Sequence, residues 1–127
     1  MVRALFDTNI VIDYLNAVPE ARRELDRFDR KAISLITWME VMVGAPSDAE
    51  RVTRAFLDSF EIVEVDEPVA EEAVRLRRAH RVKLPDAVIW ASARVHGMIL
   101  VTRNTKDFPA DDPAVRTPYQ LRRRGAH

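Results

Sequence analysis

Residues 84–104, LPDAVIWASARVHGMILVTRN, combine the two patterns that decide the fold class. Pro85 is typical of the first turn of a helix, and the apolar residues after it predict a helix over 86–96. Gly97 is the expected end of that helix, and MILVT at 98–102 has the length and composition of a buried strand. A helix that leads directly into an apolar strand is typical of α/β folds.

The same alternation of short apolar runs and helical patterns extends back to the N-terminus. Strands separated by helices imply parallel pairing with right-handed crossovers. We therefore expect a three-layer α/β/α sandwich with a mainly parallel central sheet, in a single domain over 1–127 whose tail, 113–127, is partly irregular. The other predicted strands are 2–6, 32–35 and 62–65, and the other predicted helices are 10–15, 20–28, 38–44, one that begins at 47, and 67–79.

Polar residues mark three of the expected helix starts. Thr37 is the expected N-cap of the helix at 38–44, because its hydroxyl would accept a backbone N–H of the first turn. Ser47 and Glu50 have the spacing of a capping box. Asp66 is placed to cap the helix that follows it.

Composition places the chain among ordinary globular proteins. It has 127 residues, of which 47% are hydrophobic, and no cysteine, so a single core needs neither disulfides nor a thiolate metal site. Asp7 interrupts the apolar N-terminus where a signal peptide would continue, and no apolar stretch approaches the roughly 20 residues of a membrane span. The sequence predicts a cytoplasmic protein without membrane contact. Its 20 basic and 20 acidic side chains cancel, so net charge gives no sign of nucleic-acid binding.

The most informative feature is the apolar surroundings of three carboxylates. Asp7, Glu40 and Asp86 are each the only charge in a segment that otherwise looks buried. A buried, unpaired carboxylate costs several kcal/mol, so each must be protonated, paired or bound to a cation. Because none of the three segments contains a Lys or Arg, and all three acids are expected at one side of a parallel sheet, we expect a shared cation. Carboxylate oxygens without Cys or nearby His favour Mg²⁺ or Mn²⁺ over Zn²⁺.

Each acid also has a local explanation that needs no ligand. Asp7 could cap the helix that follows it, and Asp86 could complement the dipole of its helix. Glu40 could be a surface position on a short helix. Together the three acids favour a metal site more strongly than any one of them does alone.

Four motifs occur in the order and at the intervals found in one protein family. They are FDTN at 6–9, ITWMEVMVG at 36–44, LPDAVIWASA at 84–93, and HGMILVTRN at 96–104, which continues into TKDF at 105–108. With these motifs the chain resembles PIN-domain ribonucleases, and in particular the VapC-type toxin of VapBC toxin–antitoxin pairs. The resemblance covers nearly the whole chain and implies a PIN-like fold.

The resemblance also implies an active site. The family's first acid falls on Asp7, its glutamate on Glu40 and its third acid on Asp86. Some members carry the fourth acid at the position of Asn104, and others carry it a few residues further along the chain, where this chain has Asp107. The side chains expected to bind the substrate or a metal-bound water are Thr8, Thr102, Arg103 and Asn104.

Four carboxylates of this kind would support metal-dependent hydrolysis of phosphodiesters. Asp7 and Asp86 would be the primary ligands of Mg²⁺ or Mn²⁺, Asp107 would complete a second site, and Glu40 would bind metal or orient the attacking water. The products would be a 5′-phosphate and a 3′-hydroxyl. Since this chemistry does not require the ribose 2′-hydroxyl, the preference for RNA comes from the resemblance.

Basic residues offer phosphate contacts both beside this site and away from it. Arg103 and Lys106 lie in the motif that carries Asp107. The more distant basic runs at 75–83 and 122–124 are each expected to be mainly solvated or structural.

The resemblance implies protein partners as well. A cognate VapB-type antitoxin would lay its C-terminal segment across the active-site groove, with a basic side chain in the acidic pocket. Family members also form homodimers and larger toxin–antitoxin assemblies. The helix from Ser47 to Phe60, with Val52, Ala55 and Phe56, is the expected part of one of these contacts.

Two other functions are consistent with part of the pattern. A phosphatase with Asp7 as nucleophile would need a second acid where this chain has Asn9, which disfavours it. A non-catalytic PIN-like module that binds RNA or protein stays open, because the fourth acid has two possible positions. The sequence does not specify the RNA target, the metal used in the cell or the dimer face.

Overall fold

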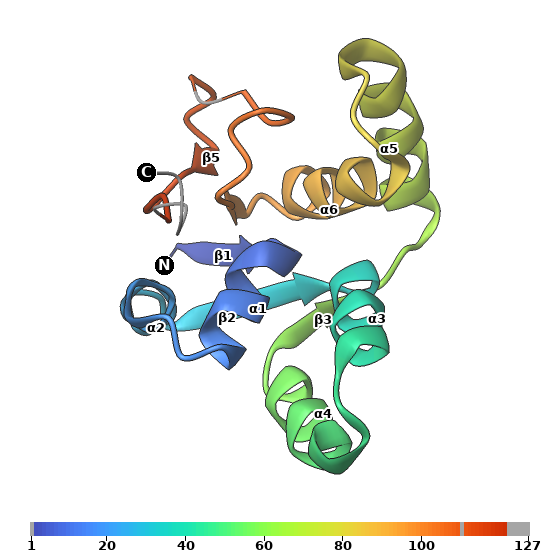
Figure 1. The fold of residues 1–127 in the computed structure, drawn as a ribbon. Helices are drawn as coiled ribbons and strands as arrows, with labels where there is room; N and C mark the ends of the chain where they lie inside the picture. The colour runs from blue at the N-terminus through green and yellow to red at the C-terminus, as the bar shows by residue number, and fades with distance from the viewer. Residues whose placement is uncertain (1, 110, 122–127) are drawn as a thin grey trace.

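The sheet at the centre of the molecule is entirely parallel (Figure 1). The computed structural model describes residues 2–109 and 111–121, and within them the sheet has five strands in the order β3-β2-β1-β4-β5. The predicted α/β class and parallel sheet are confirmed, but the fifth strand was not predicted. The strands are β1 Arg3–Phe6, β2 Arg30–Ser34, β3 Glu61–Val63, β4 Ile99–Val101 and β5 Val115–Arg116.

Helices alternate with the first four strands, as the sequence predicts. Among the described residues, none of them is long and apolar enough to cross a membrane. They are α1 Thr8–Leu15, α2 Pro19–Asp26, α3 Leu35–Gly44, α4 Glu50–Asp58, α5 Glu67–His80 and α6 Leu84–Val95, with a short 3₁₀ helix, η1, at Ser47–Ala49.

The alternation of side chains along β1 shows how the layers are arranged, since successive residues of a strand point to opposite faces. Leu5 packs in one buried cluster with residues of α5 and α6. Ala4 and Phe6 pack in a second cluster on the other face, with residues of α1, α2, α3 and α4. Helices therefore cover both faces, and the expected three-layer sandwich is confirmed (Figure 1).

Two of the expected helix caps are wrong and one is confirmed. The N-cap of α3 is Ser34, whose hydroxyl accepts from the N–H of Ile36 at 3.1 Å, whereas Thr37 lies buried inside the first turn. Asp66 caps α5 as predicted, accepting from the N–H of Val69 at 3.2 Å. Ser34 is the N-cap because it is the last residue of β2, where the backbone already has the extended conformation that an N-cap requires.

The capping box expected from Ser47 and Glu50 is also wrong. Ser47 opens η1, and α4 begins three residues later at Glu50. The residue before it, Ala49, makes no side-chain hydrogen bond to the helix. A turn of 3₁₀ helix replaces the cap.

Strand order places the ends of β1 and β4 side by side at a switch point. From β1 the chain continues to β2 on one side, while β4 pairs with β1 on the other. The backbone N–H of Asp7, directly after β1, donates to the carbonyl of Val101 in β4 at 2.9 Å. Ligands of open parallel sheets bind outside such carboxyl ends.

The tail beyond residue 113 is more ordered than expected over 114–116. The N–H of Leu100 donates to the carbonyl of Ala114 at 2.8 Å, and the N–H of Thr102 donates to that of Arg116 at 3.0 Å. The side chain of Arg116 forms a bidentate ion pair with buried Glu24 of α2. The basic run at 122–124 lies outside the described residues.

Candidate active site

Asp7 is the central carboxylate of the candidate site. It follows β1, caps α1 and is only 3% exposed. Its carboxylate accepts from the N–H of Thr8 at 2.7 Å, from the hydroxyl of Thr102 at 2.7 Å and from the side-chain amide of Asn9 at 3.2 Å. All three donors are neutral, and no Lys or Arg among the described residues pairs with this carboxylate.

Burial raises the pKa of Asp7 from 3.8 to about 6, because desolvation disfavours the charged form. The hydrogen bonds from Thr102 and Thr8 oppose this shift. The negative charges of Asp86 and Glu40 add to it, which places both carboxylates within electrostatic reach of Asp7. The carboxylates of Asp86 and Glu40 thus lie near Asp7, beyond the end of β1.

Glu40 is joined to α1 through Thr8. The hydroxyl of Thr8 donates to the Glu40 carboxylate at 2.7 Å, and the hydroxyl of Thr37 lies 2.9 Å from that of Thr8. Since the Thr8 proton is used toward Glu40, Thr37 is the donor in the second bond. Thr37 thus helps to orient an exposed carboxylate, which explains a buried hydroxyl that does not cap its own helix.

Asp86 lies in the first turn of α6 and is partly buried. Desolvation raises its pKa, and the charges of Asp107 and Glu40 raise it further, while the charge of Lys83 lowers it. The net direction is upward, so the nearby Lys83 does not compensate the acidic surroundings. Asp86 therefore links the pair formed by Asp7 and Glu40 to the loop that carries Asp107.

Asn104 and Asp107 belong to one loop that holds its own shape. The side-chain amide of Asn104 donates to the Asp107 carboxylate at 2.9 Å, and its carbonyl oxygen accepts from the N–H groups of Lys106 and Asp107, both at 3.1 Å. The N–H of Asn104 in turn donates to the hydroxyl of Thr102 at 2.9 Å. Asn104 thus occupies the place between Asp107 and the Thr102–Asp7 pair.

The chemistry of this set of donors fits a hard divalent cation. Asp7, Glu40, Asp86 and Asp107 supply oxygen ligands, and the pKa values of Asp7 and Asp86 are raised mainly by desolvation and further by neighbouring carboxylates. Among the described residues, however, no three acidic or histidine side chains are arranged as a preformed metal site. Thr8 and Asn104 each donate a hydrogen bond to one oxygen of Glu40 and of Asp107, so an ion bound by these carboxylates would draw the set closer together while both hydrogen bonds could persist.

A family model of the PIN domain matches residues 4–110, a range that contains the four carboxylates. The chain belongs to the PIN-domain family. The match begins within β1 and ends after the Asp107 loop, so the β1 and β4 ends that frame the candidate site are both part of the PIN domain.

Individual PIN proteins similar to this chain are ribonucleases and toxin–antitoxin components. The tRNA(fMet)-specific endonuclease VapC of Shigella flexneri is 31% identical over 122 residues, 85% of this chain and 91% of the relative. Ribonuclease VapC10 of Mycobacterium tuberculosis is 32% identical over 113 residues, 83% of this chain and 85% of the relative. A solved toxin–antitoxin complex from Klebsiella pneumoniae contains a chain that is 50% identical, with a TM-score of 0.88 and coverage of 93% and 99%. The resemblance to a VapC-type ribonuclease toxin is confirmed.

Two of the residues expected to bind substrate, Thr102 and Arg103, form hydrogen bonds within this PIN domain instead. Thr102 is fully buried, and its hydroxyl donates to Asp7. The guanidinium of Arg103 donates to the carboxylate of Asp13 at 2.6 and 3.1 Å. Both side chains therefore hold the site in place, whereas Thr8 and Asn104 stay partly exposed beside the carboxylates.

The sequence did not predict a role for three further residues of the site, Asn9, Asp13 and Tyr119. Asn9 donates to Asp7 and accepts from the N–H of Arg103 at 3.3 Å, which ties α1 to the loop after β4. Asp13 accepts from Arg103 and, at 2.8 Å, from the hydroxyl of Tyr119. Asp13 is another lone charge in an apolar segment, so the criterion that found Asp7 could have found it.

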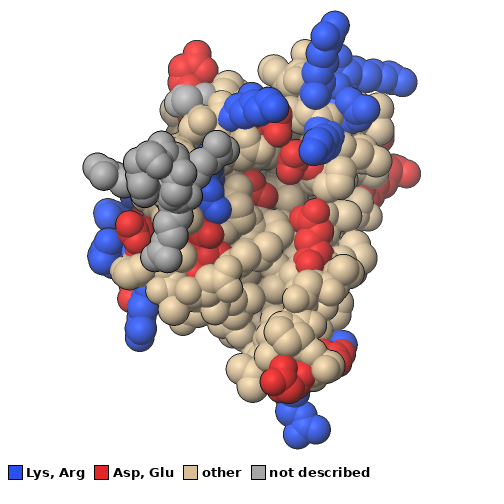
Figure 2. Space-filling view, viewed as in Figure 1, with Lys and Arg blue, Asp and Glu red and all other residues tan. Residues whose placement is uncertain are grey.

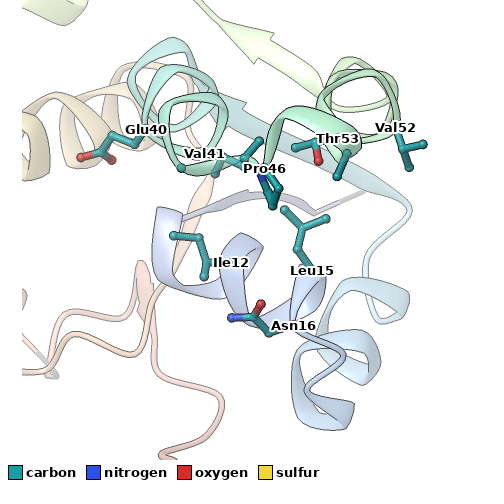
Figure 3. A pocket seen from close by; sticks show the side chains of 11 residues that line it. Ile12, Leu15, Asn16, Glu40, Val41, Pro46, Val52 and Thr53 are labelled. Carbon is teal, nitrogen blue, oxygen red and sulfur yellow. The ribbon is translucent and has the colours of Figure 1, made fainter.

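An apolar groove of about 550 Å³ lies beside Glu40, between α1, α3 and α4 (Figure 3). Figure 3 shows Ile12 and Leu15 of α1 facing Val41 and Pro46 across it, with Glu40 at one end. The predicted contact helix contributes to this groove through Val52, which is 73% exposed. Its Phe60 is buried in the core instead and cannot serve as a contact residue.

Proposed function

We propose that this PIN domain is the endoribonuclease toxin of a toxin–antitoxin pair and that Asp7, Glu40, Asp86 and Asp107 hold its divalent metal. The observation that carries the proposal is the state of Asp7. Its carboxylate is 3% exposed, has neutral donors only and has a pKa raised to about 6 in the company of two more acids. A fold that served only as a scaffold would gain stability by replacing this charge.

Each residue would have a distinct task in RNA hydrolysis. Mg²⁺ or Mn²⁺, when bound, supplies an activated water and stabilises the oxygen that leaves. Asp7 and Asp86 would be the main ligands, with Asp107 completing the set. Glu40 would bind metal or accept the proton of the water, and Thr8 would keep it oriented through the 2.7 Å hydrogen bond.

The remaining polar groups would keep these ligands in position. Thr102 and Asn9 fix the rotamer of Asp7, and Asn104 fixes that of Asp107. Hydrogen-bonded partners of metal ligands typically change metal affinity or activity by about 10 to 100-fold when they are removed. The hydrogen bonds from Thr102 and Asn9 to Asp7, and from Asn104 to Asp107, would therefore matter for activity although these donors need not touch RNA.

An antitoxin is the proposed protein partner. Solved relatives of this chain are toxin–antitoxin complexes, which supports it. The apolar groove that ends at Glu40 suits an amphipathic segment, and the acidic cluster suits a basic side chain of that segment. We place the protein in the cytoplasm, where RNA and a cognate antitoxin would be present, and keep the homodimer as a prediction.

The test is cleavage of a mixed pool of tRNA and single-stranded RNA by partner-free protein in Mg²⁺, in Mn²⁺ and in EDTA. Asp7→Asn removes the central ligand but keeps a good helix N-cap. Glu24→Gln is the matched control, because Glu24 is equally buried but lies in the ion pair with Arg116. We expect metal-dependent cleavage that Asp7→Asn abolishes and Glu24→Gln retains.

Failure would take a specific form. Folded wild-type protein that binds RNA but cuts none of the pool in either metal would support the non-catalytic binding module instead. Cleavage that persists in EDTA, or in Asp7→Asn, would remove the carboxylates from the mechanism.

A further inference from the structure

Four exposed cations gather where α5 ends and α6 begins. Figure 2 shows basic side chains at the end of α5, above acidic side chains on the middle of the same face. None of the four forms an ion pair with a described residue, unlike Arg75 and Arg94, which share Glu72. The four residues, called the basic turn below, are Arg77, Arg78, Arg81 and Lys83.

Arg81 occupies a backbone conformation that does not favour arginine. Its φ of 57° and ψ of 26° lie in the left-handed region at the C-terminal end of α5. Glycine has the lowest conformational cost at this position of a helix end, and it is the residue most often found there. The dipole of α5 suits a positive charge at Arg81, but the backbone conformation favours a residue without a side chain.

Lys83 is similarly unfavourable in its local setting. It is the N-cap residue of α6 and makes no side-chain hydrogen bond to the helix. N-cap positions favour Ser, Thr, Asp or Asn, and a cation there opposes the positive end of the helix dipole. The dipole of α5 accounts for Arg77 and Arg78 in its last turn, but it does not account for Lys83.

The basic turn is attached directly to the candidate active site. Lys83 is three residues before Asp86, and its charge acts on that carboxylate. A row of aromatic rings fixes the end of α5 against the Asp107 loop. The ring of His80 lies 4.9 Å from that of Trp90, which lies 5.6 Å from that of Phe108.

We propose that the basic turn is a phosphate-binding surface that holds the RNA backbone beside the carboxylates. The proposal rests on the ribonuclease function proposed above and adds the surface that receives the substrate. Four carboxylates repel a polyanion, and the chain as a whole has no net charge, so attraction beyond that of a bound metal must come from a local group of cations. Arg81 and Lys83 supply it at positions where the fold alone would favour Gly and Ser.

The decisive variant is Arg81→Gly/Lys83→Ser, which removes two cations and improves both local conformations. If the two cations take no part in RNA binding, the melting temperature should be equal or higher and RNA binding unchanged, whereas a stabilising role would lower the melting temperature. The phosphate-binding role predicts an equal or higher melting temperature together with weaker RNA binding. Each lost contact reduces affinity for single strands about fivefold at 0.1 M salt, because the association constant varies as roughly the −0.7 power of salt concentration per contact.

Binding would be measured by fluorescence anisotropy with a labelled single-stranded oligoribonucleotide of mixed sequence, in EDTA, between 50 and 300 mM KCl. We expect the Kd of the double variant to rise about 25-fold at 0.1 M salt and the salt slope to fall by about 1.4. Arg22→Gln/Arg23→Gln is the charge-matched control, since both are exposed on α2, at the other end of the molecule (Figure 1). Its Kd should stay within about twofold of wild type.

Cleavage kinetics in Mn²⁺ separate this proposal from the ribonuclease proposal. A raised KM with an unchanged kcat for Arg81→Gly/Lys83→Ser supports the surface. If wild-type protein cuts no RNA but still binds it about 25-fold more tightly than the double variant, the ribonuclease proposal is refuted and the phosphate-binding surface is supported. Unchanged Kd and salt slope in the double variant would overturn the surface, and so would a loss of antitoxin binding with RNA binding intact.

Discussion

Helix α1 carries two buried carboxylates that the fold treats in opposite ways. Asp7, before its first residue, is 3% exposed, and Asp13, near its last turn, is 5% exposed. Asp13 is paired with the guanidinium of Arg103 at 2.6 Å and with the hydroxyl of Tyr119 at 2.8 Å. Asp7 has equally short hydrogen bonds, but none of its donors carries a charge.

The difference separates a carboxylate that supports the fold from one that, in the function proposed above, serves a ligand. Arg103 follows Thr102, the residue that donates to Asp7, but its guanidinium pairs with Asp13 instead. Glu24 repeats the structural case, with Arg116 as its partner. A buried carboxylate left without a cation in a molecule that neutralises the others is the mark of a cation-binding site.

The largest expected effect is on activity. Asp7→Asn should lower RNA cleavage in Mn²⁺ by more than about 100-fold, since partners of metal ligands already cost up to that amount. The free energy of unfolding should not fall, because the substitution removes a desolvated charge and keeps the N-cap. Cleavage rates and urea denaturation of the same preparation check both halves. A variant that is inactive because it is unfolded would contradict the comparison.

The second effect concerns the pH dependence of stability in metal-free protein. The pKa of Asp7 is about 6 in the folded protein and 3.8 in the unfolded chain, so the folded state binds more protons between these values. The free energy of unfolding should therefore fall as pH rises from 4 to 7, by about 2 kcal/mol from this group alone. Urea denaturation of wild type and Asp7→Asn across this range isolates the contribution as the difference between the two curves. Parallel curves would mean that Asp7 is not desolvated as described.

Replacing Asp13, the carboxylate paired with Arg103, should lower stability more than activity. Asp13→Asn leaves Arg103 and Tyr119 without their shared acceptor and should lower the free energy of unfolding by about 2 kcal/mol. This is below the usual 3–5 kcal/mol range for a broken buried pair, because the Arg103 side chain is 26% exposed. Denaturant melts give the stability, and cleavage at saturating Mn²⁺ should fall far less than in Asp7→Asn.

The smallest effect is expected at Tyr119. Tyr119→Phe removes the 2.8 Å hydrogen bond but leaves the ion pair between Asp13 and Arg103, so the loss of stability should be about 1 kcal/mol. The phenol pKa, which burial and the hydrogen bond to Asp13 raise, can be followed in wild type by its ultraviolet absorbance. Normal titration of Tyr119 near pH 10 would show that the tail does not close over Asp13.

The sequence predicted the elements that depend on local patterns and missed those that depend on distant partners. Asp66 caps its helix and residues 98–102 contain a buried strand, as their neighbours indicate. Thr37 has the residue type of a cap, but its hydroxyl bonds to Thr8, 29 residues away. A strand of two residues, Val115–Arg116, is too short to produce a pattern.

The same limit applies to the candidate site. The four carboxylates could be found because three of them are isolated charges and the fourth follows from the resemblance. The isolated-charge criterion fits Asp13 equally well, and only the fold brings it to Arg103, 90 residues later in the chain. The sequence therefore locates acids in apolar segments, and the structure shows which are buried, as Asp7 and Asp13 are but exposed Glu40 is not, and which have a cation.

The most direct test of this account is the melting temperature of partner-free protein at pH 7.5, in EDTA and in millimolar Mn²⁺, for wild type and Asp7→Asn. An ion that binds only the folded state stabilises it by roughly 2.7 kcal/mol at 100 times its Kd. We predict a clear rise in the melting temperature of wild type and none in Asp7→Asn, which should already melt at least as high as metal-free wild type. A wild-type protein whose melting temperature is the same in EDTA and in Mn²⁺ would contradict the assignment of Asp7 as the centre of a metal site.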